Sequence, residues 1–198
     1  KVFAGIVIAP IGGVIVGLLL TGLIITIFAS RKPAVVNKTF GRLQIISSAW
    51  FALTHGANDG QKTMGIIVLI LFSAGLIPEL EMPLWVIFAA ATAMGLGTFF
   101  GGYKVIKTLG VKITKLKPYQ GFAAETGGGI MLAIFATLGI PASTTHAITG
   151  TIMGAGAARR KRAVRWNVSR QIVFSWIITI PGSAAMGIGF TFLINLFV

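Results

Sequence analysis

Two acidic residues lie within long apolar stretches of the sequence, where a charged side chain is costly. Asp59 belongs to residues 55–60 (HGANDG), and Glu125 belongs to residues 120–126 (QGFAAET). A charge at the centre of a bilayer costs about 2.5–3.5 kcal/mol on insertion scales, so intramembrane acids usually serve ions or protons. Asp59 and Glu125 as a pair have the chemistry of a sodium or proton site. The alternatives are structural, with Asp59 as a helix cap and Glu125 as a hydrogen-bonded residue near a helix end.

Three consecutive hydroxyl side chains, Ser143, Thr144 and Thr145, follow Pro141 at the expected start of a short helix. The unpaired N–H groups and the dipole at a helix N-terminus favour an anion. Hydroxyl groups add neutral donors, so a phosphate could bind at residues 143–145 and still be released. The alternative interpretation is an ordinary N-cap after a proline.

Two further kinds of polar side chain flank these motifs. Lys62 lies three residues after Asp59, at helical spacing, where it either pairs with Asp59 or attracts an anion, and both interpretations stay open. His55 and His146 adjoin the two motifs, where packing and a proton relay are both consistent with their positions. Two histidines are too few to predict a metal site, so the only metal ion we expect is sodium at Asp59 and Glu125.

The composition indicates a membrane protein. Of the 198 residues, 55% are hydrophobic and only 11% are charged, and the mean hydropathy is +0.90. Soluble domains average about 25% charged residues. The net charge of +13 is concentrated in residues 31–42, 104–117 and 159–170, between apolar stretches. This placement is typical of cytoplasmic loops and disfavours nucleic acid as a partner.

Hydrophobic runs predict an all-α, polytopic transmembrane bundle, because a helix needs about 20 apolar residues to cross a bilayer. The second run is too long for one straight span, and Gly56 and Gly60 beside polar residues predict a broken helix there. The fourth run is interrupted at residues 139–146, and its second arm is too short to span, which predicts a re-entrant hairpin. The five runs are residues 3–28, 40–74, 84–102, 119–158 and 168–198.

The distribution of lysine and arginine predicts the orientation. The basic loops, including those expected at residues 29–38 and 103–117, belong in the cytoplasm, and the acidic loop at residues 75–83 belongs outside. We therefore expect a multi-pass protein of the inner (plasma) membrane.

Four motifs in order resemble the signature of the inorganic phosphate transporter (PiT) family, in its bacterial form. They are HGAND with QKTMG at residues 55–65, QGF with Glu125 at residues 120–125, PASTTH at residues 141–146, and residues 154–166. The resemblance implies two inverted repeats around a site near the membrane midplane. It assigns phosphate to Ser143, Thr144, Thr145, Asn58 and Asp59, the coupling ion to Asp59, Asn58 and Glu125, and secondary roles to Lys62, Gln120 and His146.

This resemblance implies a cation-coupled inorganic phosphate symporter that works by alternating access. The resemblance implies no cofactor other than a co-transported proton or Na+. The pair Gln61-Lys62 resembles the sequence of bacterial family members that are thought to be coupled to protons. The implied partners are phosphate, alone or as a metal complex, the lipid bilayer, the N-terminal repeat of the same transporter, and a second copy. Because the motifs occur once, we expect residues 1–198 to form a single transmembrane domain, the C-terminal repeat, with the N-terminal repeat absent.

Three alternatives differ in testable ways. A sulfate permease of the same fold would bind an anion that cannot donate a hydrogen bond, whereas an acceptor carboxylate at the site favours protonated phosphate. A non-transporting binding or regulatory subunit would lack coupled uptake. An enzyme is disfavoured, because no nucleophile elbow or phosphate-loop signature occurs.

Overall fold

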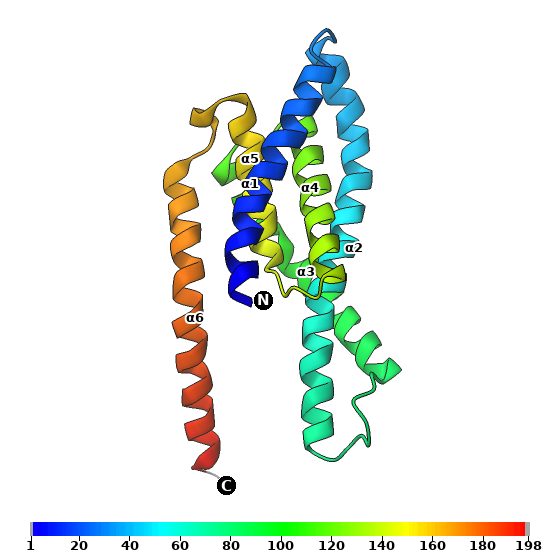
Figure 1. Cartoon of the computed structure of the whole chain (residues 1–198), viewed down its shortest axis with the longest axis vertical. Helices are drawn as coiled ribbons and strands as arrows, with labels where there is room; N and C mark the ends of the chain where they lie inside the picture. The colour runs from blue at the N-terminus through cyan, green and yellow to red at the C-terminus, as the bar shows by residue number, and fades with distance from the viewer. Residues whose placement is uncertain (1, 197–198) are drawn as a thin grey trace.

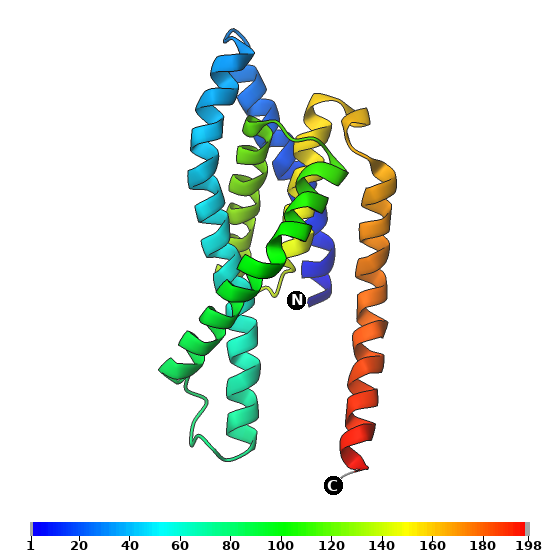
Figure 2. The same cartoon turned by 180° about the vertical axis from the view of Figure 1, so that it is seen from behind.

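The computed structural model describes residues 2–196 and is built from helices, with no strand in that range (Figures 1 and 2). A π-helical turn at Thr108–Ile113 extends α3, and a short 3-10 turn at Lys161–Ala163 precedes α6. The α-helices are α1 (Val2–Ile27), α2 (Pro33–Ser73), α3 (Leu84–Lys107), α4 (Pro118–Thr137), α5 (Thr144–Arg159) and α6 (Trp166–Asn195).

Three helical segments are long and apolar enough to cross a membrane: Gly5–Ile27, Leu84–Ile113 and Trp166–Asn195. They coincide with three of the predicted runs. The prediction of a loop at residues 103–117 is largely wrong, because the helix continues to Ile113. Lys104 and Lys107 lie in the last turn of α3 and helical backbone continues past them, because lysine is a good helix former and does not end a helix.

The long helix α2 corrects two predictions. It begins at Pro33, whose fixed φ suits the first helical position, so the loop expected at residues 29–38 is shorter than predicted. It then runs for 41 residues without interruption, so the broken helix predicted at residues 55–60 is wrong. Glycine permits a break but does not require one. The polar side chains of this segment find partners on α4 and α5, so the backbone need not unwind to satisfy them.

The predicted hairpin is present as α4 and α5, joined by residues 138–143, which we call the tip. Gly139 has a φ of +59°, in the left-handed region that glycine tolerates, and lets the chain leave α4 while Ile140 N–H donates to Phe135 C=O at 2.9 Å. The 16 residues of α5 span about 24 Å, less than the roughly 30 Å of a bilayer core. Along the long axis of the molecule, the tip lies partway along α2 and α6 and not at either end, as a re-entrant hairpin requires (Figures 1 and 2).

Helices α1 and α5 run in the same direction and approach through glycines. Gly13 and Gly17 of α1 face Gly150 and Gly154 of α5, each pair with the spacing of a GxxxG motif. A Cβ on Gly13 would lie 2.7 Å from the Ala147 carbonyl oxygen, and a Cβ on the other three glycines would meet backbone atoms of the facing helix at least as closely. Small residues let helix backbones approach in lipid, where dispersion contacts drive association.

Helix α6 runs beside the bundle and extends beyond it (Figures 1 and 2), and it contacts the bundle through Val168, Ile172 and Trp176. Ser169 is its buried residue, and most of its apolar side chains are exposed. Such a surface needs lipid or another protein around it.

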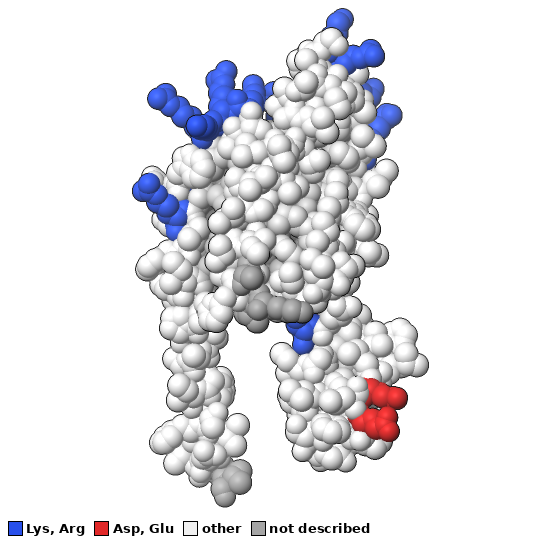
Figure 3. All heavy atoms as spheres, in the orientation of Figure 1, with Lys and Arg blue, Asp and Glu red and all other residues white. Residues whose placement is uncertain are grey.

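Charge is segregated along the long axis of the molecule. Basic side chains gather at the end that carries the α1–α2 and α5–α6 connections, and acidic atoms appear near the opposite end (Figure 3). The two basic stretches of the sequence that adjoin these connections therefore lie at the same end.

Candidate functional site

Asp59 on α2 lies at the centre of a polar network that reaches the α4–α5 hairpin. Lys62 Nζ lies 2.8 Å from Asp59 Oδ1, and Thr144 Oγ1 donates to Asp59 Oδ2 at 2.7 Å. His55 Nδ1 lies 3.3 Å from the same Oδ2. His55, Asp59 and Lys62 share one face of α2 because their spacing is four and then three residues. We call Asp59, Lys62 and Thr144 the tip network.

Lys62 also fixes the tip itself. Its ammonium donates to the Ala142 carbonyl at 2.7 Å, so one side chain joins α2 to the residue that precedes the hydroxyl run. Ser143 is the N-cap of α5, and its Oγ accepts a hydrogen bond from His146 N–H at 3.3 Å. Of the two interpretations of Lys62, the structure shows the ion pair with Asp59.

Asn58 points away from this network, toward α4. Its Nδ2 donates to the Leu132 carbonyl at 3.1 Å and to the Thr54 carbonyl at 3.5 Å, and the residue is 7% exposed. The amide therefore holds α2 against α4, next to the site rather than in its centre.

Glu125 on α4 forms a second cluster, well separated from the first. Ser47 Oγ donates to Glu125 Oε2 at 2.6 Å, and Gln44 Nε2 donates to Oε1 at 3.2 Å. We call these three residues the Glu125 cluster. Ser47 precedes Asp59 by 12 positions on α2, about 18 Å along a helix. The structure thus does not bring Asp59 and Glu125 together, and a sodium ion shared by both carboxylates does not fit this geometry.

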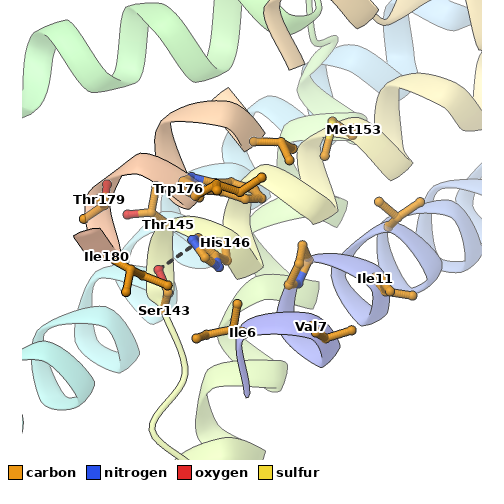
Figure 4. A pocket seen from close by; sticks show the side chains of 14 residues that line it. Ile6, Val7, Ile11, Ser143, Thr145, His146, Met153, Trp176, Thr179 and Ile180 are labelled. Atoms are coloured by element: carbon orange, nitrogen blue, oxygen red, sulfur yellow. Dashed lines mark hydrogen bonds between the residues drawn. The ribbon is translucent and has the colours of Figure 1, made fainter. Parts of the chain in front are cut away.

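The hydroxyl run is divided between two surroundings. Thr144 faces Asp59, whereas Ser143 and Thr145 line a cavity of about 780 Å³ between α1, α5 and α6 (Figure 4). His146 lies in the same cavity, with its ring centroid 3.9 Å from that of Trp176. The walls are mostly apolar. Consecutive residues at a helix start project in different directions, so the three hydroxyls do not converge on one point.

Gln120 stabilises the α4–α5 hairpin and is not part of the tip network. It is 3% exposed, its Nε2 donates to the Ala155 carbonyl at 2.7 Å, and its Oε1 accepts from Lys117 N–H at 3.0 Å. It joins α4 to α5 about 1.4 helical turns before Glu125.

Sequence reasoning missed Gln44 and Ser47. The signal was available, because residues 44, 47, 51, 54, 55, 58, 59 and 62 recur at three- and four-residue spacing and most of them are polar. Within residues 2–196 the structure groups no three His, Cys, Asp or Glu side chains that could hold a metal ion.

Comparisons with known proteins agree with one another. Residues 25–187 match the family described as the phosphate transporter family. A Rhizobium meliloti protein described as a probable low-affinity inorganic phosphate transporter is 49% identical over 185 residues, which is 93% of this chain and 55% of that protein. A Bacillus subtilis protein of the same description is 40% identical over 197 residues, which is 99% of this chain and 59% of that protein.

One solved structure, described as the sodium-dependent phosphate transporter, is similar in fold. Its TM-score is 0.66 at 26% sequence identity, and the match covers 87% of this chain and 52% of that chain. The chain spans about half the length of the curated relatives it matches.

Proposed function

This chain belongs to the phosphate transporter family, and from that premise we propose that it is one half of a cation-coupled inorganic phosphate symporter. The family resemblance predicted from the motifs is confirmed, and the family and the matched relatives are described as transporters, not as enzymes. The coupling ion, the site residues and the second half are the proposed part.

The observation that carries the proposal is the tip network. Lys62 and Thr144 supply an ammonium and a hydroxyl donor at the start of α5, where backbone N–H groups also favour an anion. Asp59 accepts both of these side-chain donors. A phosphate that needs them must compete with a carboxylate, and like charges repel. Neutralising Asp59 would release the donors, so uptake of a cation or proton and binding of phosphate favour each other.

The two clusters suggest a division of roles. Asp59 already has an ammonium beside it, whereas among the described residues Glu125 accepts hydrogen bonds from neutral groups only. An added cation stabilises the second arrangement more. We assign phosphate to Thr144, Lys62 and the α5 N-terminus, with Ser143, Thr145 and Asn58 supporting it. Asp59 links ion binding to phosphate binding, because neutralising it frees Lys62 and Thr144. Glu125 is the separate carboxylate that binds the ion.

The proposed placement in the membrane follows from the charges. The basic end would face the cytoplasm of an inner membrane, and residues 75–83 would face outside (Figure 3). The tip would then lie within the membrane, where irregular backbone is tolerated only against protein or water. The exposed side chains of α6 and the cavity wall leave room for a second, inverted repeat, or another copy of the chain, to complete the site.

Uptake into proteoliposomes tests the proposal. The native protein is reconstituted, and labelled phosphate uptake is measured under an imposed proton gradient and, separately, under a sodium gradient, with sulfate as competitor. We expect uptake under one gradient and no competition by sulfate. Equal competition by sulfate would reassign the anion. Absence of uptake under both gradients would leave a binding or regulatory subunit as the better description.

A further inference from the structure

A second cavity, of about 200 Å³, lies at the basic end of the molecule, far from the tip network. It forms where α1 ends and where α2 and α4 begin. We call it the basic-end pocket. Its lining residues are Ile24, Ile25, Phe28, Ala29, Arg31, Pro33, Val36, Asn37, Lys117 and Tyr119.

The charges around this pocket are of one sign. Arg31 and Lys117 line it, and no acidic residue in the described range 2–196 does. Two helices also begin at its edge, α2 at Pro33 and α4 at Pro118, so the positive ends of two helix dipoles lie beside the two cations. An anion is the complementary ligand, and phosphate groups are favoured at such helix starts.

Most of the remaining lining residues are apolar. Ile24 belongs to a buried cluster with Phe40 and Ala123, and Phe28 and Val36 pack against it. Ile25, which also lines the pocket, is 39% exposed. A free inorganic phosphate would gain nothing from these walls, whereas a phospholipid has a phosphate for the cations and acyl chains for the apolar surface.

Asn37 favours a ligand that can donate a hydrogen bond. Its Oδ1 is buried and has no hydrogen-bond partner among the described residues. Leaving such an acceptor unpaired is costly, so a ligand group that donates is favoured. A headgroup ammonium would be repelled by Arg31 and Lys117. A headgroup hydroxyl provides a donor without a positive charge.

We propose that the basic-end pocket binds an anionic phospholipid whose headgroup carries hydroxyl groups, with phosphatidylglycerol as the matching chemistry. Arg31 and Lys117 contact the phosphodiester, Asn37 accepts from a headgroup hydroxyl, and the acyl chains follow α1. Basic pockets between transmembrane helices on the cytoplasmic side commonly hold anionic headgroups. This inference requires a membrane protein with its basic end at a lipid surface, but it does not depend on phosphate transport.

Native mass spectrometry of the purified protein tests the site. Micelles containing equal phosphatidylglycerol and phosphatidylcholine are offered to the wild type, to the double variant Arg31→Gln/Lys117→Gln, and to the control Lys38→Gln/Lys115→Gln. The control removes one exposed charge near each lining cation, Lys38 in the second turn of α2 and Lys115 in the segment before α4, and leaves the pocket lining unchanged. We expect the ratio of bound phosphatidylglycerol to bound phosphatidylcholine to fall about fivefold for each lining charge removed. The control should keep the wild-type ratio.

The charge-preserving swap Arg31→Lys/Lys117→Arg should retain the lipid, which separates lost charge from lost folding. Asn37→Leu should abolish the preference for phosphatidylglycerol over phosphatidylmethanol, which has the same phosphodiester and no hydroxyl. Equal losses in the lining and control variants would overturn the proposal in favour of diffuse surface charge. Displacement of the lipid by inorganic phosphate in a Lys117-dependent manner would overturn it in favour of free phosphate.

Discussion

The tip network and the Glu125 cluster hold a carboxylate in opposite ways. Asp59 has an ammonium at 2.8 Å and a hydroxyl at 2.7 Å, supplied by Lys62 and Thr144. Glu125 has a hydroxyl at 2.6 Å and an amide at 3.2 Å, both neutral. The first network ties α2 to the start of α5, and the second ties α2 to α4.

The comparison teaches that an intramembrane acid is not by itself an ion site. A compensated carboxylate mainly organises the groups around it, and disturbing it rearranges those groups. An uncompensated carboxylate retains its attraction for a cation. If this distinction holds, substitutions in the tip network should impair phosphate handling, and substitutions in the Glu125 cluster should impair coupling.

The largest effect is expected from Asp59→Asn. The amide keeps the size of the side chain but loses the charge that Lys62 and Thr144 contact, and hydrogen bonds to charged groups contribute about 1.5–3 kcal/mol each. Because the amide stays neutral, it cannot link uptake of a cation or proton to release of the Lys62 and Thr144 donors, so we expect gradient-driven phosphate uptake in proteoliposomes to fall by about 100-fold or more. Gel-filtration elution should match the wild type, and uptake at the wild-type rate would contradict the role of Asp59.

Lys62→Met should come next, because it makes Asp59 resemble Glu125. It removes both the ion pair and the bond to the Ala142 carbonyl. We expect the KM for phosphate to rise by about 30-fold, the equivalent of one charge-assisted hydrogen bond. Lys62→Arg preserves the charge and should recover part of the loss. An unchanged KM in Lys62→Met would show that the ammonium only supports the fold.

Glu125→Gln should separate coupling from binding. The substitution removes the charge while leaving an oxygen for the Ser47 hydroxyl. We expect gradient-driven uptake to fall by about tenfold, as when one cation contact is lost, while exchange of phosphate without a gradient continues. Glu79→Gln, in the exposed loop after α2, is the matched control and should change neither measurement. Equal losses of uptake and exchange would indicate that Glu125 is structural.

Ser47→Ala should give the smallest change. It removes one hydrogen bond from Glu125 and leaves the carboxylate and Gln44 in place. We expect the half-saturating concentration of the coupling cation to change by about fivefold. Ser48→Ala is the control, because Ser48 is exposed and bonds only the Ile45 carbonyl among the described residues. A similar change in both variants would argue against a specific contact at Glu125.

Much of the fold could be predicted because the length of an apolar run and the residues that begin or end a helix are local properties of the sequence. The spans, the hairpin and the N-cap at Ser143 all follow from residues close together in the sequence. The break in α2 could not be predicted correctly, since glycine allows two conformations and the choice depends on α4 and α5. In this fold Asn58 and Asp59 reach partners on those helices, and α2 stays continuous.

The site divides in the same way. The Asp59–Lys62 pair is visible in the sequence because helical spacing brings the two residues together. The pairing of Glu125 with Gln44 and Ser47 depends on the register of α4 against α2, which no local pattern contains. Two acids in a sequence with few of them suggested one shared site, but the same register places them in separate clusters.

The glycine contact between α1 and α5 has a consequence for biosynthesis. Gly13 leaves the ribosome long before Gly150, its neighbour in the folded protein. At 5–20 residues per second, about 140 intervening residues take roughly 7–30 seconds to synthesise. During that interval the small-residue face of α1 has no α5 to pack against, so newly inserted α1 must be held by lipid, by the insertion machinery or by a chaperone. This close contact between α1 and α5 is therefore among the last to form.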